Sequence, residues 1–187
     1  MNITVYCGVS QGNSPLYSQV AKKLGDWIAQ NNHTLIYGGG KAGMMGKLAN
    51  TVLKKGGQVI GIIPTFLKER ELAHSDLTEI IEVNSMAERK QKMLDYGDAC
   101  IALPGGPGTL EEITEVISWS RIDKNQNPCI VYNENNYYDA LKNMYDTMVN
   151  HDFLTHSDRN AILFSNDLTQ IESFIQNYKT PEIRSYS

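Results

Sequence analysis

The chain has 187 residues, of which 41% are hydrophobic and 20% are charged, and its net charge is −4 with a pI near 5.6. This composition is typical of a soluble globular protein and excludes a disordered chain, a collagen and a disulfide-stapled miniprotein. Because nucleic-acid binders usually carry an excess of Lys and Arg, the acidic balance disfavours nucleic acid as a partner. At about 150 residues per domain, the length predicts one domain over residues 1–180, with a frayed tail over 181–187.

The cysteines and histidines show no pattern of a disulfide framework or a metal site. Cys7, Cys100 and Cys129 share no CxxC spacing, and each lies in or beside an apolar, β-rich run. The four histidines are scattered, so we expect no metal. The N-terminus enters a strand-like run without a signal or membrane-spanning segment. We therefore expect buried, reduced thiols in a cytoplasmic protein with no membrane contact.

Short apolar runs alternate with helical patterns along the chain. Seven runs predict strands, at Ile3–Cys7, Thr34–Tyr37, Gln58–Ile63, Glu79–Val83, Ala99–Leu103, Cys129–Tyr132 and Ala161–Phe164. Helices are predicted from Ser14-Pro15 onward, over 43–53, from Ser85 to Tyr96, from Thr109 to about Arg121, over 137–149 and over 168–177. Continuous apolar runs indicate strands covered on both faces. The alternation therefore predicts one α/β domain with a doubly wound parallel sheet of about seven strands.

Glycine-rich loops follow three of the predicted strands, at Cys7–Asn13, Gly38–Gly46 and Pro104–Thr109. Ligands of an open parallel sheet bind beyond the carboxyl ends of its strands, so the bare amides of these loops are expected to face one crevice. Two of the loops lead directly into helix N-termini, which favour a phosphate. Tight turns between strands and helices also need glycine, which is the alternative explanation for any one loop.

Two common nucleotide motifs do not fit these loops. Gly38, Gly40 and Gly43 match G-x-G-x-x-G, but they follow the second strand, and no acid stands near Ile63 to hold a ribose. NAD is therefore disfavoured. A P-loop also fails, because Gly46-Lys47 is followed by leucine and lacks the earlier glycine.

The segment LPGGPGTLEE, residues 103–112, places carboxylates within about one turn of a glycine-rich helix start. A carboxylate there would repel a phosphate, so Glu111 and Glu112 suggest that another part of the ligand carries hydroxyls or a developing positive charge. Adjacent helical residues point about 100° apart, so the two glutamates should have different roles. The structural alternative for Glu112 is a capping box with Thr109.

A second capping-box pattern, Ser85-x-x-Glu88, precedes two adjacent cations. For Glu88 we favour the capping interpretation. Arg89 and Lys90 near a helix N-terminus oppose the helix dipole, which indicates anion recognition. Because Lys92 extends the patch, a solvated basic face is the alternative.

Together these motifs resemble the LOG (lonely guy) family of cytokinin-activating phosphoribohydrolases, often labelled "possible lysine decarboxylase". Residues 104–112, PGGPGTLEE, resemble the family motif PGGxGTxxE, and residues 86–90, MAERK, stand in place of MHERK. Cys7-Gly8, Gly38–Gly46 in place of GGGxxGLMG, and Arg70-Glu71 follow in the family's order. The resemblance runs from the first strand to about Ile130. It implies a Rossmann-like homodimer that cleaves the N-glycosidic bond of a nucleoside 5′-monophosphate to a free base and ribose 5-phosphate.

By motif position, the resemblance implies that Arg89 and Glu112 are the catalytic pair. It also implies substrate contacts from Glu71, Lys90, Gly105, Gly106, Pro107, Gly108, Thr109, Leu110, Glu111 and Ser118. From the other loops we expect contacts from Gly8, Ser10, Gly39, Gly40, Gly43 and Met45. A carboxylate such as Glu112 can stabilise an oxocarbenium-like ribose or orient water. Arginine is no proton donor at neutral pH, so Arg89 would act by charge and hydrogen bonding. No metal or organic cofactor is required.

Three positions depart from the family pattern. Pro107 stands where the family usually has an aromatic or other large side chain, Ala87 replaces the histidine of MHERK, and Val9 replaces a serine. None of them touches the expected catalytic pair. The base stays open between plain adenine and an isoprenylated adenine, which would need an apolar pocket built from Met44, Met45, Met86 and Met93.

Other functions fit parts of the pattern. A non-hydrolytic nucleotide or nucleotide-cofactor carrier would use the same glycine loops and basic pair, but would gain little from Glu112. A decarboxylase would need pyridoxal phosphate on a Schiff-base lysine, and nothing singles out Lys41 or Lys90 for that role. A DNA-processing protein is disfavoured by the acidic charge balance.

Overall fold

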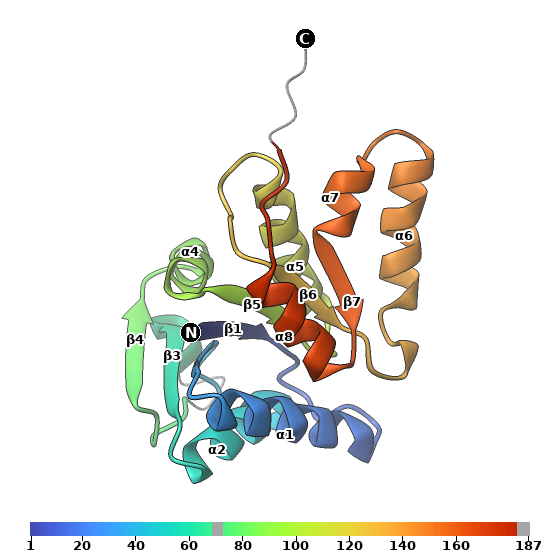
Figure 1. Cartoon of the computed structure of the whole chain (residues 1–187). Coiled ribbons are helices and arrows are strands. Elements are labelled where there is room, and N and C mark those ends of the chain that lie inside the picture. Colours follow the sequence, from blue (N-terminus) through green and yellow to red (C-terminus); the bar gives the residue numbers. More distant parts are fainter. Residues whose placement is uncertain (69–72, 183–187) are drawn as a thin grey trace.

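The computed structural model describes residues 1–68 and 73–182, and its centre is one seven-stranded parallel sheet (Figure 1). The strands are β1 (Asn2–Tyr6), β2 (Thr34–Tyr37), β3 (Gln58–Pro64), β4 (Glu79–Val83), β5 (Ala99–Ala102), β6 (Cys129–Tyr132) and β7 (Ile162–Ser165). Their order is β4-β3-β2-β1-β5-β6-β7, and every neighbouring pair is parallel. The predicted strands and the doubly wound, Rossmann-like α/β fold are confirmed.

Helices cover both faces of the sheet. They are α1 (Pro15–Gln30), α2 (Gly43–Lys54), α3 (Thr65–Lys68), α4 (Met86–Tyr96), α5 (Pro107–Ser120), α6 (Asp139–Asn150), α7 (His156–Asn160) and α8 (Leu168–Gln176). Side chains of α1, α2 and α8 share one apolar core with Ile3 and Val5 of β1, whereas α4, α5 and α6 share the other with Tyr6. Successive residues of a strand point to opposite faces, which divides the side chains of β1 between the two cores.

Local signals explain most helix starts. Ser14 and Ser85 cap α1 and α4 as predicted, each accepting a backbone N–H through its hydroxyl. The Glu88 carboxylate accepts the Asn84 amide at 2.9 Å, whereas in a standard capping box it would accept the amide of the N-cap residue, Ser85. The capping role of Glu88 is therefore confirmed.

The predicted cap of α5 is wrong. The helix begins at Pro107 after Gly106, and Thr109 lies buried inside its first turn with no capping bond. Proline at the first helical position already has the φ angle that a helix needs. The N–H that proline lacks would have no partner at this position. The helix therefore begins at Pro107, earlier than a cap at Thr109 predicts. The capping box of Thr109 with Glu112 is therefore not formed.

Three short helical segments were not predicted: α3, α7 and the 3-10 turn η1 (Glu134–Asn136). Segments of three to five residues carry too few positions for a helical period. Because Tyr137 caps η1, which ends at Asn136, α6 starts at Asp139 and not at residue 137 as predicted.

The chain order creates a switch point between β1 and β5. From β1 the chain builds outward through β2 and β3 to β4, and then returns to place β5 on the other side of β1. At such a point the connections leave in opposite directions and open a crevice at the carboxyl ends of the strands. The loops after β1 and β5 meet there.

The remaining expectations concern the cysteines and the chain end. Cys7, Cys100 and Cys129 are buried and unpaired, as expected. In the predicted tail, Pro181 is buried and Glu182 is exposed, while 183–187 lie outside the described residues. Within the described ranges, no helix is long and apolar enough to cross a membrane.

Candidate active site

A pocket of about 400 Å³ lies at the switch point, where the loops after β1 and β5 face the starts of α1 and α2. Four of the residues expected to contact substrate line it: Gly8, Ser10, Gly105 and Gly106. The other lining residues are Val9, Gly12, Asn13, Tyr17, Met44, Pro104 and Tyr137. The prediction that the glycine-rich loops share one crevice is thus confirmed for the first and third loops.

Glycines let these loops approach one another closely. The Gly8 amide donates to the Pro104 carbonyl at 3.3 Å, which joins the loop after β1 to the loop after β5. Gly43 has a φ of +55°, and a Cβ there would collide with the Val9 carbonyl. Gly43 therefore allows the start of α2 to pack on the first loop, and its role is to shape the crevice.

The start of α5 presents bare backbone. The first bond of the helix runs from the Leu110 amide to the Gly106 carbonyl at 3.1 Å, so the preceding amides have no partner within the helix. Apart from the chain neighbours and the backbone of α5 itself, no heavy atom of the described residues lies within 4 Å of where a Cβ of Gly106 or Gly108 would stand. These amides, together with the positive end of the helix dipole, suit an anionic group such as a phosphate.

Arg89 is buried with only 4% of its surface exposed, although it belongs to α4. Its Nε donates to the Ile62 carbonyl at 3.2 Å and its Nη2 to the Gly38 carbonyl at 3.0 Å. A Cβ on Gly38 would collide with Nη2. The guanidinium is therefore held at the carboxyl ends of β2 and β3, and for Arg89 the alternative of a solvated basic face is wrong.

Glu112 lies in the second turn of α5 and is half-buried. Burial raises the pKa of the Cys7 thiol well above its usual value, the nearby Glu112 carboxylate raises it further, and the Arg89 guanidinium lowers it. Both charges therefore lie close enough to Cys7, at the end of β1, to shift the pKa of its thiol. Cys7 itself stays a neutral thiol and is unsuited to nucleophilic attack.

Lys90 joins α4 to α5. Its Nζ lies 2.5 Å from a Glu111 carboxylate oxygen and 2.9 Å from one of Glu115. Partial burial opposes the charge, but the hydrogen bonds to Glu111 and Glu115 prevail and raise the pKa of Lys90. Two of the expected substrate contacts, Lys90 and Glu111, are thus paired with each other.

The other expected contacts are spread over the surroundings of the crevice. Thr109 is buried against Gly105, whereas Pro107, Leu110 and Ser118 are exposed on α5. Ser118 lies six residues beyond Glu112, about 9 Å further along the helix axis, so it is away from the pocket.

The second glycine loop is less open than expected. Gly39 has a φ of +80° and its carbonyl accepts the His74 amide, and Gly40 is buried and bridges to Ala73. Met45 packs against the apolar core, while its neighbour Met44 lines the pocket. Glu71 lies outside the described residues.

Two aromatic residues of the pocket were missed. Tyr17 of α1 and Tyr137 after β6 pack edge to face, with ring centroids 5.9 Å apart. The Tyr137 hydroxyl donates to the Gly105 carbonyl at 2.6 Å. The two residues are 120 positions apart in the sequence, so only the tertiary fold brings them to the same wall.

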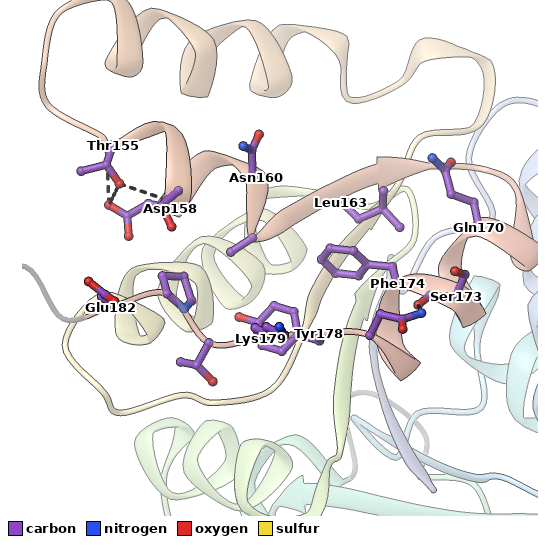
Figure 2. A pocket seen from close by; sticks show the side chains of 15 residues that line it. Thr155, Asp158, Asn160, Leu163, Gln170, Ser173, Phe174, Tyr178, Lys179 and Glu182 are labelled. Carbon is purple, nitrogen blue, oxygen red and sulfur yellow. Dashed lines mark hydrogen bonds between the residues drawn. The ribbon is translucent and has the colours of Figure 1, made fainter.

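A larger hollow of about 870 Å³ lies elsewhere, between α7, α8 and residues 177–182 (Figure 2). Asn160 and Ala161, which directly precede β7, are among its lining residues. Thr155 and Asp158, drawn at its edge, form the capping box of α7, and Asp158 also pairs with Arg121 at 3.5 Å. None of the expected site residues that the structure describes lines this hollow, so its size does not make it the active site.

Comparison with known proteins fits this geometry. A family model described as "Possible lysine decarboxylase" matches residues 45–173. The chain is 40% identical over 181 residues to the cytokinin riboside 5′-monophosphate phosphoribohydrolase of Rhodococcoides fascians, an alignment that covers 96% of this chain and 90% of that protein. The chain belongs to the LOG family. A second LOG relative, LOG2 of Arabidopsis thaliana, is 37% identical over 94% of this chain and 83% of its own length.

Solved structures share the fold. The molybdenum cofactor binding protein of Rippkaea orientalis has a TM-score of 0.68 at 23% identity, covering 93% of this chain and 96% of that chain. The molybdenum cofactor carrier protein of Chlamydomonas reinhardtii has a TM-score of 0.70 at 16% identity, covering 94% and 95%. At these identities the likeness shows the common fold alone.

Proposed function

We propose that this LOG-family chain is a phosphoribohydrolase that cleaves the N-glycosidic bond of a nucleoside 5′-monophosphate to a free base and ribose 5-phosphate. The observation that carries the proposal is the placement of one carboxylate, Glu112, behind an open helix start that suits a phosphate. Several relatives at 36–40% identity are named as enzymes of this activity.

The phosphate would bind at the amides that begin α5, at the edge of the pocket. Glu112 follows Pro107 by five residues, which places it about 7.5 Å further along the helix axis. A nucleotide anchored by its phosphate can then extend its ribose toward the carboxylate. Glu112 thus faces the sugar and not the phosphate, which avoids the repulsion of like charges.

In the reaction, the C1′–N bond breaks with its electrons moving to the base, and the ribose becomes oxocarbenium-like. The Glu112 carboxylate stabilises this positive charge and orients the water whose oxygen bonds to C1′. The attacking water loses one proton and the base nitrogen gains one, which gives ribose 5-phosphate and the free base. Arg89, fixed by the Ile62 and Gly38 carbonyls, supplies a permanent positive charge for the phosphate or for the departing base.

The two alternatives are less well supported. A Schiff base needs a neutral amine, but the hydrogen bonds to Glu111 and Glu115 raise the pKa of Lys90 and keep it protonated. A non-hydrolytic carrier has no use for a carboxylate near the ribose, and the carriers among the solved structures share only the fold.

We further propose a homodimer in the cytoplasm. Two large apolar side chains, Met86 and Leu110, are 36% and 42% exposed near the starts of α4 and α5, two helices joined by the Lys90 ion pairs. A second copy of the chain would cover them. The three buried, unpaired cysteines suit a reducing compartment.

The test is an end-point assay with AMP and isopentenyladenosine 5′-monophosphate in separate reactions. Chromatography should detect free base and ribose 5-phosphate in equal amounts, and the faster substrate identifies the base. Failure to release base from either nucleotide, by protein that binds both, would contradict hydrolysis and favour the carrier.

A further inference from the structure

We propose that Tyr137 is a positioning residue that fixes the phosphate-binding loop before α5, an inference that rests on the phosphate site of the proposed function. Its hydroxyl donates to the Gly105 carbonyl at 2.6 Å, across 32 positions of sequence. The ring packs edge to face on Tyr17 at 5.9 Å and on Tyr138 at 4.9 Å. Hydroxyl and ring together join the loop after β6 to the wall of the pocket.

Three consecutive carbonyls of the loop after β5 are held from outside. The Leu103 carbonyl accepts the Tyr138 hydroxyl at 2.8 Å, the Pro104 carbonyl accepts the Gly8 amide at 3.3 Å, and the Gly105 carbonyl accepts the Tyr137 hydroxyl. In a trans peptide the carbonyl and the following N–H point in opposite directions. Holding a carbonyl therefore also sets the direction of the next amide.

This rule gives the three contacts different consequences. The Gly8 contact sets the Gly105 amide, and the Tyr137 contact sets the Gly106 amide at the start of α5. The Tyr138 contact sets no amide, because Pro104 has no N–H. The Tyr138 contact therefore supports the loop without orienting an N–H group, whereas the Tyr137 contact orients the N–H of Gly106.

The loop needs such support at Gly106, where Thr109, the side chain that packs on Gly105, makes no contact. Apart from its chain neighbours, no heavy atom of the described residues lies within 4 Å of the Cβ position of Gly106, so no side chain packs against this residue there. Glycine has more backbone freedom to lose than any other residue, and a loop that is already ordered binds its ligand at a lower entropic cost.

The turn that presents Tyr137 is itself specialised. Asn135 and Asn136 both have positive φ, at 50° and 60°, a conformation that asparagine tolerates better than most residues. The Asn133 side chain accepts the Tyr138 amide at 2.7 Å and donates to Asp139 at 2.7 Å. The backbone before α6 is thus fixed so that Tyr137 points back to the loop.

The test compares Tyr137→Phe with Tyr138→Phe, each of which removes one hydroxyl and keeps its ring. For Tyr137→Phe we expect the Kd of ribose 5-phosphate, measured by calorimetry, and the KM of the nucleotide to rise about fivefold, which corresponds to one ordinary hydrogen bond. We expect kcat to stay within twofold, because the phosphate is bound equally in the ground and transition states. Tyr138→Phe should lower Tm more than Tyr137→Phe does, yet leave Kd and KM within twofold.

Three results would overturn the proposal: an unchanged Kd and KM in Tyr137→Phe, a fall in kcat alone, or an equal loss of affinity in Tyr138→Phe. Tyr96→Phe, at the exposed end of α4 beside the first residue of β1, is the neutral control. If the wild type binds ribose 5-phosphate but hydrolyses no nucleotide, the calorimetry still decides on Tyr137 while the proposed function fails. A wild type that neither binds nor hydrolyses would overturn both.

Discussion

Gly38→Ala should damage the protein through Arg89 alone. The backbone of Gly38 lies outside the left-handed region, so alanine fits its angles, but the new Cβ would collide with Arg89 Nη2. The collision breaks the hydrogen bond of 3.0 Å from Arg89 Nη2 to the Gly38 carbonyl. This bond is shielded from water, because Arg89 is only 4% exposed. A hydrogen bond from a charged group contributes about 1.5–3 kcal/mol. We therefore expect a loss of about 2 kcal/mol, which lowers Tm by about 4–8 °C in a chain of this size.

The assay is a double-mutant cycle in urea, with Gly38→Ala, Arg89→Ala and the double variant. Because the steric partner is absent in Arg89→Ala, the glycine substitution should cost less than about 0.5 kcal/mol in that background. Activity should fall with Gly38→Ala, since the charge at the strand ends moves. An equal cost of Gly38→Ala in both backgrounds would refute the coupling between the two residues.

Two further predictions concern pH and assembly. Burial lowers the pKa of His33 below its usual 6.5, so the unfolded chain takes up a proton that the folded chain refuses. The free energy of unfolding should therefore fall as the pH drops below about 6.5, and His33→Gln should flatten this dependence. If urea titrations from pH 8 to pH 5.5 gave His33→Gln the same pH dependence as the wild type, His33 would not be its source. Burial also lowers the pKa of His74, so His74 contributes to the same pH dependence of the free energy of unfolding. Leu110→Glu, which puts a charge on an exposed apolar side chain of α5, should convert the proposed dimer to a monomer in light scattering, whereas a wild type that is already monomeric would exclude the dimer.

The sequence predicted the sheet well because burial on both faces leaves a direct mark. The runs at Thr34–Tyr37 and Cys129–Tyr132 match β2 and β6 residue for residue. In these strands the side chains of both faces must be apolar, so a continuous run suffices to find them. Short segments such as η1, whose form depends on two asparagines with positive φ, have no comparable signal.

The site could be predicted only in part. Motif positions predict a catalytic role for Arg89 and Glu112, which stays a prediction. The burial of Arg89 between two strand ends depends on contacts with Ile62 and Gly38 that no local pattern encodes. The early start of α5 at Pro107 removed the capping alternative for Glu112.

The methionine and tyrosine side chains that line the pocket illustrate the same limit. Met44 lines the pocket and Met45 does not, because the start of α2 sets which methionine turns inward. Tyr17 and Tyr137 meet only through the order of the strands in the sheet. The sequence therefore predicts which loops form the crevice better than it predicts the side chains that line it.

The most direct test of the central claim is kcat for Glu112→Gln, which removes the charge and keeps the shape. A carboxylate that stabilises the oxocarbenium-like ribose or orients the water contributes about 10²–10⁴-fold, so kcat should fall by about 10³-fold while AMP still binds. Glu115→Gln, one turn further along α5 and paired with Lys90, is the matched control and should stay within twofold. Base release by Glu112→Gln at the wild-type rate would contradict the catalytic role of this carboxylate.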